Sequence, residues 1–211
     1  MLVSRVRVKL CGITRVEDAL SAADEGVDAI GLVFYPPSPR CVSLPAAEAI
    51  MAKLPPFVTT VGLFLDAQAL WVQQVLATLP LDVLQFHGQE TADFCLAFQR
   101  PYLKSVGMQS ADALSQVVAG HPQAQGFLLD GHSHGEAGGT GQVFDWSQWP
   151  ATLDRPLILA GGLTPDNVEQ AIRQVKPWAV DVSSGVEQSK GIKDPKKIRE
   201  FMRGVQRASA Q

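Results

Sequence analysis

Short apolar runs rich in β-branched residues alternate, from one end of the chain to the other, with longer stretches whose apolar residues recur at helical spacing. This alternation is typical of an α/β fold built on a parallel sheet. Eight runs are predicted as strands, at residues 6–11, 29–34, 59–65, 83–87, 102–106, 126–130, 156–160 and 179–182.

The intervening segments predict helices that each bury one apolar stripe against the sheet. In four of them apolar residues recur at i, i+3, i+4 and i+7, starting from Val16, Val72, Val168 and Ile198. Two further helices are predicted over residues 92–98 and 111–118. Three start signals support the pattern: Thr14 with Glu17, Thr164 before Pro165, and Asp194 before Pro195.

Eight strand–helix units in 211 residues, about 26 residues each, match the lower end of the size range of a (β/α)₈ TIM barrel. An open doubly wound sheet is the alternative. However, no GxGxxG pattern follows the first predicted strand, and no obvious linker divides the chain. We therefore predict one α/β domain, a (β/α)₈ barrel over residues 1–211.

Composition narrows the possible partners and location. The chain is 46% hydrophobic and 18% charged with a net charge of -3, so it has no overall electrostatic attraction to nucleic acid or to an anionic membrane. No apolar run approaches the roughly 18 residues of a membrane span, and the N-terminus lacks a signal-peptide pattern. Cys11, Cys41 and Cys95 fit neither a disulfide framework nor a zinc site. We expect free thiols and a cytoplasmic protein.

Ligands of such a barrel bind at the carboxyl ends of the strands, so the polar residues there are the candidate site. They are Cys11, Arg40, Gln85, His87, Asp130 and Asp181. Glycine-rich segments follow the last two strands, where such barrels commonly hold a phosphate on backbone N–H groups. The segments are Gly161 with Gly162, and Ser183, Ser184 and Gly185. The predicted ligand is a phosphate ester.

Each candidate also has a plainer interpretation. Cys11 could be a small buried apolar residue, Asp130 could cap the next segment, and His87 could be an ordinary buried histidine. Arg40 could be a surface ion-pair partner, although the prolines before it stiffen its loop. A glycine-rich segment at 138–141 could be no more than a turn.

His132 and His134 have a spacing that can chelate a metal, but no third ligand is evident nearby in the sequence. We therefore predict no metal site.

Taken together, the motifs at the predicted strand ends resemble the phosphoribosylanthranilate isomerase family of tryptophan biosynthesis over nearly the whole chain. They are KLCGIT at 9–14, GLVFYPPSPR at 31–40, VLQFHG at 83–88, LLD at 128–130, GGTG at 138–141, LAGGL at 159–163, DVSSGVE at 181–187 and GIKD at 191–194. Two departures from the family pattern, Phe86 and the loop over residues 131–137, bear on the shape of the pocket for the aromatic acid.

The resemblance implies an Amadori rearrangement of N-(5-phosphoribosyl)anthranilate to 1-(2-carboxyphenylamino)-1-deoxyribulose 5-phosphate, with Asp130 as general acid and Cys11 as general base. It implies that Arg40 pairs with the anthranilate carboxylate. The phosphate would be held by Gly162, Ser183, Ser184 and Gly185, and the sugar would be lined by Gln85, His87 and Asp181. Such a reaction moves only protons, so no cofactor is expected.

These roles make physical demands. As an acid, Asp130 needs a pKa well above the reference value of about 3.9, which burial or the nearby Asp181 could provide. As a base, Cys11 needs an accessible thiolate, which a cation would favour. Lys9 is a candidate for that cation, because strand alternation places it on the same side as Cys11.

Three other functions are open at this point. A metal-dependent epimerase would need His and Asp ligands that converge on one ion. The aminoaldose isomerase of histidine biosynthesis would be expected to use two aspartates, one of them where this chain has Cys11. A non-enzymatic phosphate-binding barrel would bind without turnover. The expected partner is a small phosphoribosyl substrate, and the protein is expected to be a monomer or a homodimer.

Overall fold

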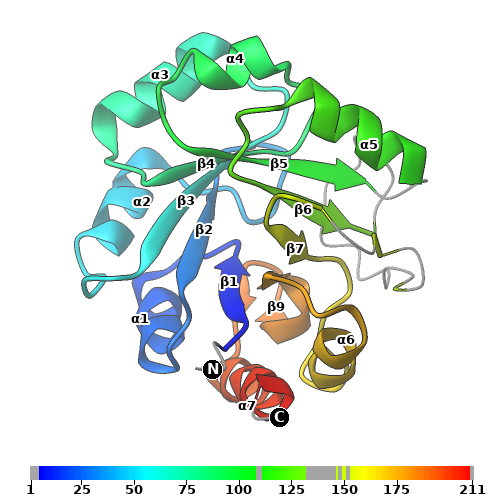
Figure 1. Ribbon diagram of the computed structural model, residues 1–211. Helices are drawn as coiled ribbons and strands as arrows, with labels where there is room; N and C mark the ends of the chain where they lie inside the picture. The colour runs from blue at the N-terminus through cyan, green and yellow to red at the C-terminus, as the bar shows by residue number, and fades with distance from the viewer. Residues whose placement is uncertain (1–4, 108–110, 132–145, 147–148, 151–152, 210–211) are drawn as a thin grey trace.

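The computed structural model describes residues 5–107, 111–131, 146, 149–150 and 153–209, and it forms a closed barrel (Figure 1). Parallel strands follow one another around the barrel in sequence order, and β8 pairs with β1. The strands are β1 (Arg7–Cys11), β2 (Ala29–Val33), β3 (Thr59–Phe64), β4 (Val83–Phe86), β5 (Tyr102–Gly107), β6 (Gly126–Asp130), β7 (Leu157–Leu159) and β8 (Ala179–Val182). The predicted (β/α)₈ barrel is confirmed, and the open sheet is excluded.

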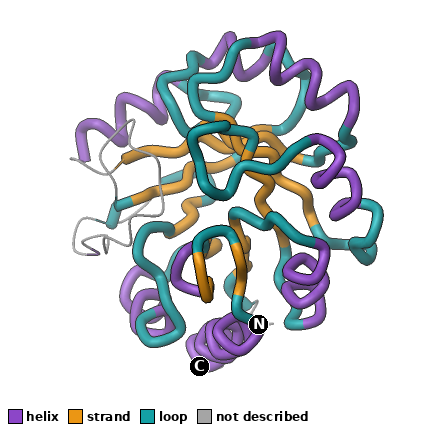
Figure 2. Tube along the Cα trace, turned by 180° about the vertical axis from the view of Figure 1, so that it is seen from behind, coloured by secondary structure: helices purple, strands orange, loops and turns teal. Residues whose placement is uncertain are grey.

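Helices surround the barrel on its outside, as the views from the front and from behind both show (Figures 1 and 2). They are α1 (Val16–Asp24), α2 (Leu44–Met51), α3 (Ala69–Thr78), α4 (Ala92–Leu96), α5 (Ala111–Gly120), α6 (Val168–Val175) and α7 (Pro195–Ser209). The end of α7 lies beside the start of β1, where the Val6 amide donates to Ser209 Oγ at 3.3 Å. Among the described residues, no helix is long and apolar enough to cross a membrane.

Each predicted strand agrees with the structure to within one residue at either end. Besides a single 3₁₀ turn at Ser184–Val186, two structured regions were not predicted. One is α2, whose start signal is Ser43: its hydroxyl accepts from the Ala46 amide at 3.3 Å, and a proline follows in the first turn. The other is a small antiparallel hairpin of β9 (Glu187–Ser189) and β10 (Ile192–Lys193) after β8.

The helix start signals had mixed outcomes. Asp194 caps α7 as predicted, because its Oδ1 accepts from the Lys196 amide at 2.9 Å. The capping box at Thr14 is wrong: α1 begins at Val16 without a side-chain cap, and the Thr14 hydroxyl instead donates to the Gly191 carbonyl. The helix expected after Thr164 begins at Val168, because residues 165–167 form a turn.

The core has two layers, as strand alternation requires. One cluster fills the barrel interior and consists of Leu128, Ile158, Ala160 and Ala179, with Leu103 packed against it. The larger cluster lies between the strands and the helices and includes the intervening strand residues, such as Phe127 and Leu129. The barrel centre is therefore packed with side chains, and a ligand can bind only at one of its ends.

Phe86 belongs to the outer layer. Its ring packs on Phe64, Phe94, Phe98 and Tyr102, with ring centroids 5.9–6.1 Å apart. It does not line the pocket at the carboxyl ends of the strands. The expectation that Phe86 bears on the shape of the substrate pocket is therefore wrong, since the residue packs β4 against α4. The departure at 131–137 lies outside the described residues, except for Gly131.

We predict that Phe86→Ala lowers the free energy of unfolding by ~3–5 kcal/mol, because it removes a fully buried ring and leaves a cavity among aromatic side chains. Urea unfolding monitored by circular dichroism measures the change. Leu70→Ala is the control: this side chain is 74% exposed, and its loss should change stability by less than about 0.5 kcal/mol. A Phe86→Ala effect as small as the control effect would contradict this description of the core.

Candidate active site

The carboxyl ends of the strands enclose a cavity of about 80 Å³. Its lining includes all six polar candidates from the sequence: Cys11, Arg40, Gln85, His87, Asp130 and Asp181. These residues come from five different strands or the loops that follow them, since Gln85 and His87 both belong to the end of β4, and only the closed barrel brings them together. The remaining lining residues are Val33, Tyr35, Ser38, Leu63, Leu65 and Ser183.

Cys11 ends β1 and is 6% exposed. Its neighbour across the strand pair is Gly31 of β2. A Cβ at Gly31 would lie 2.7 Å from the Cys11 sulfur and 3.1 Å from Lys9 Nζ. The thiol and the ammonium group therefore share the space that this glycine leaves open, which confirms that Lys9 and Cys11 lie on the same side of the strand.

Lys9 is held by a buried ion pair that links β1 to β8. Its Nζ lies 2.9 Å from Asp181 Oδ1, and the two side chains are 5% and 10% exposed. Burial alone would lower the pKa of Lys9, but the Asp181 carboxylate and the nearby Cys11 outweigh burial and raise it. Lys9 is therefore charged, and it is a cation next to the thiol.

Despite this cation, the pKa of Cys11 is raised above its ordinary value, chiefly by burial and further by Asp181, while Lys9 and Lys193 act in the opposite direction. The expectation that Lys9 favours the thiolate is correct in direction, but burial outweighs it. Cys11 is therefore a neutral thiol near pH 7.

Asp130 ends β6 and is 8% exposed. Its Oδ2 lies 3.9 Å from His87 Nε2. Burial lowers the pKa of His87, so the imidazole is neutral near pH 7, in agreement with its plainer interpretation. Gln85 Nε2 lies 3.3 Å from His87 Nδ1 and 3.2 Å from Ser105 Oγ. Its buried Oε1 has no hydrogen-bond partner among the described residues.

A second cavity, of about 40 Å³, adjoins the first and shares Asp130, Asp181 and Ser183 with it. The rest of its lining comes from the ends of β7 and β8 and the loops after them: Ala160, Gly161, Gly162, Leu163, Val182 and Ser184. Gly185 does not line it. A Cβ at this position would collide with the Leu163 carbonyl oxygen, so a glycine here lets the loops after β7 and β8 pack closely together. The two glycine-rich segments thus lie together, as predicted.

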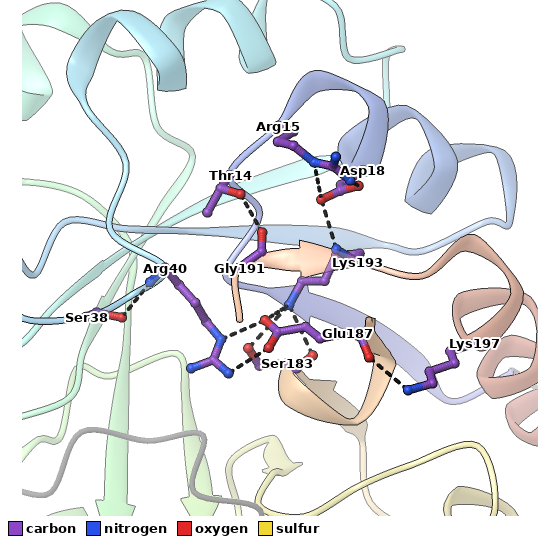
Figure 3. A network of polar contacts seen from close by, with 10 residues as sticks. All are labelled: Thr14, Arg15, Asp18, Ser38, Arg40, Ser183, Glu187, Gly191, Lys193 and Lys197. Atoms are coloured by element: carbon purple, nitrogen blue, oxygen red, sulfur yellow. Dashed lines mark hydrogen bonds and ion pairs between the residues drawn. The ribbon is translucent and has the colours of Figure 1, made fainter. Parts of the chain in front are cut away.

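Arg40 is neither a surface residue nor unpartnered. Its side chain is 9% exposed and forms a fork with Glu187 of the hairpin, with Nε 2.7 Å from Oε1 and Nη2 2.8 Å from Oε2 (Figure 3). Lys193 Nζ lies 3.0 Å from the same Oε1. The plainer interpretation of Arg40 as an ion-pair partner is thus correct in part, but the pair is buried at the rim of the pocket.

A family model described as N-(5'-phosphoribosyl)anthranilate (PRA) isomerase matches residues 8–204 of this chain. The chain belongs to this family. A PRA isomerase of Pseudomonas fluorescens strain SBW25 is 57% identical over 206 residues, which cover 98% of each chain. The crystal structure of the Thermotoga maritima PRA isomerase is 40% identical, has a TM-score of 0.87, and is matched over 95% of this chain and 98% of that one.

A further solved PRA isomerase was determined in complex with reduced 1-(o-carboxyphenylamino)-1-deoxyribulose 5-phosphate. It is 38% identical with a TM-score of 0.83, and the match covers 95% of this chain and 98% of that chain. The family resemblance inferred from the motifs is therefore confirmed.

Sequence reasoning did not single out two charged residues of this PRA isomerase site, Glu187 and Lys193. The available signal was weak: an acidic residue follows the 183–185 segment by two positions, and a lysine follows six residues later.

The chelating pair His132 and His134 and the 138–141 segment lie outside the described residues. Within the described residues, no three His, Cys, Asp or Glu side chains gather as metal ligands.

The raised pKa of Cys11 predicts how its alkylation depends on pH. Iodoacetamide reacts with the thiolate, so a raised pKa moves the midpoint of the rate to a pH above the ordinary value of 9.0. Mass spectrometry of the Cys11 peptide measures this rate, and Lys9→Met should move the midpoint higher still. A midpoint at or below 9.0 in the unmodified protein would contradict the burial argument.

Proposed function

We propose that the chain converts N-(5-phosphoribosyl)anthranilate to 1-(2-carboxyphenylamino)-1-deoxyribulose 5-phosphate, with Asp130 as general acid and Cys11 as general base. The observation that carries this proposal is that one cavity is lined by a thiol from β1 and a carboxyl from β6, with Arg40 at the rim and the two glycine-rich loops beside it. The cavity thus offers both proton-transfer groups together with a place for each charged end of the substrate.

Ring opening is the first step. A proton passes from the Asp130 carboxyl to the furanose oxygen as the C1–O bond breaks, and the nitrogen lone pair forms the C1=N bond of a Schiff base. This role requires Asp130 to be protonated in the complex; its side chain is largely buried and lines the cavity together with Asp181. His87, a neutral ring 3.9 Å away, does not supply a charge that would oppose protonation.

Removal of the C2 proton is the second step. The Cys11 thiolate takes this proton, and the electron pair moves to give an enolamine that tautomerises to the ketone. Burial raises the pKa of Cys11, which lowers the thiolate fraction but makes each thiolate a stronger base. Lys9, charged and close to the sulfur, stabilises the thiolate when it forms.

Binding is divided between the two sides of the cavity. Arg40 takes the anthranilate carboxylate, and the backbone at Gly162, Ser183, Ser184 and Gly185, with Gly161 in the same turn, takes the phosphate. Between them, Gln85, His87 and Asp181 line the part of the cavity that we assign to the ring-opened sugar. Because both steps move only protons, we propose no cofactor and no metal.

We propose the cytoplasm as the location, which is consistent with three free cysteines. The proposed partner is a small phosphoribosyl substrate, with no role for nucleic acid or membranes.

The proposed assembly is a monomer or a homodimer. A 38% identical relative from Thermotoga maritima is described as dimeric. In this chain the fully exposed Phe57, at the amino-terminal end of the barrel, is an apolar group that a second copy would cover. Light scattering at several concentrations distinguishes the two states.

We expect Cys11→Ala and Asp130→Asn each to lower kcat by roughly 10² to 10⁴-fold, the usual loss for a positioned base or acid. Decay of anthranilate fluorescence from freshly generated substrate measures turnover. Binding of the reduced product should be kept, which shows that each variant folds. Full activity in either variant would refute its assigned role. A wild-type protein that binds the reduced product but never turns over the substrate would refute the activity, and the aminoaldose substrate of histidine biosynthesis would be tested next.

A further inference from the structure

Arg40, Glu187 and Lys193 form a buried triad at the rim of the cavity (Figure 3). Their side chains are 9%, 6% and 0% exposed. The triad holds two cations and one anion, so it carries one positive charge that its own members do not balance. Burying an unpaired positive charge costs free energy unless an anion compensates it. A ligand bound in the pocket can provide that anion.

The geometry of Arg40 leaves one edge for that ligand. A guanidinium has five N–H donors. Glu187 accepts from Nε and Nη2, which are on one edge of the plane. The other edge, formed by Nη1 and the second Nη2 hydrogen, has no partner among the described residues, and Arg40 lines the cavity. This edge can form a second fork with a carboxylate.

Glu187 is itself held firmly. Lys193 Nζ contacts its Oε1 at 3.0 Å and also donates to the Ser183 carbonyl at 3.1 Å, at the start of the segment proposed for phosphate binding. The Lys193 amide in turn donates to Asp18 Oδ2 of α1 at 3.0 Å. Burial alone would raise the pKa of Glu187, but the bonds from Arg40 and Lys193 hold it below its usual range.

We propose that Glu187 is a positioning residue for the substrate carboxylate: it fixes one edge of Arg40 so that the other edge faces the pocket, and Lys193 fixes Glu187 and ties it to the segment at Ser183. Preorganising the guanidinium removes the cost of ordering a long side chain when the ligand binds. The inference rests on the proposed contact between Arg40 and the anthranilate carboxylate.

The test compares two ligands: the reduced product, and the same molecule without the ring carboxylate. Glu187→Gln should weaken binding of the carboxylated ligand by roughly 10 to 100-fold and change binding of the other by less than about 3-fold. Substrate KM should rise with kcat little changed, because a contact held equally in ground and transition states affects only binding. Glu187→Asp, which keeps the charge, should recover part of the loss.

Glu169→Gln is the matched control, because Glu169 also pairs with two cations, Arg173 and Arg207, but on the outer surface. It should leave both affinities unchanged. Equal weakening of both ligands by Glu187→Gln and by Glu187→Asp would indicate a merely structural role and overturn the inference.

The Arg40→Lys variant distinguishes the contact between Arg40 and the substrate carboxylate from the positioning role of Glu187. If it removes the preference for the carboxylated ligand while Glu187→Gln keeps it, the positioning role of Glu187 is wrong and the role of Arg40 stands. If Arg40→Lys also keeps the preference, the Arg40 contact is wrong, and the inference falls with it.

Discussion

Charge buried at the carboxyl-terminal rim of the barrel has to be paired, and this constraint arranges the site. Lys9 and Asp181 pair across β1 and β8, the strands that close the barrel. Arg40 and Lys193 pair with Glu187, which joins the loop after β2 to the hairpin after β8. Removing one partner of such a pair leaves the other charge buried without compensation. The same contacts that satisfy these charges therefore also fix the functional groups around the cavity.

The thiol is the group that this arrangement leaves neutral. Burial raises the pKa of Cys11, and Lys9 only partly offsets it, because burial is the larger effect and the Asp181 carboxylate bonded to Lys9 also raises this pKa. A base kept mostly in its protonated form is protected from unwanted chemistry, since the thiolate is the reactive species. Proton abstraction then depends on a small population of a strong base beside an ammonium group.

The sequence predicted the parts of the fold that local patterns determine. Strand boundaries were right to within one residue because buried strands are compact apolar runs in the sequence. Six polar candidates line one cavity because each lies at the carboxyl end of such a run or in the loop after it. The prediction of a capping box at Thr14 was wrong because the Thr14 hydroxyl donates to the carbonyl of Gly191, which is distant in sequence. Glu187 was not identified for a similar reason: it is 147 residues from Arg40 in sequence, and no local pattern reports that a buried guanidinium needs a carboxylate.

The central claim is that Cys11 removes the proton from C2, and substrate deuterated at C2 tests it most directly in a Cys11→Ser variant. A hydroxyl is a much weaker base at this position, so proton removal becomes the slow step. The account predicts slower turnover with a larger ratio of protiated to deuterated rates than in the wild type. A variant with the wild-type rate and the wild-type isotope effect would contradict it and assign proton abstraction to another group in the cavity.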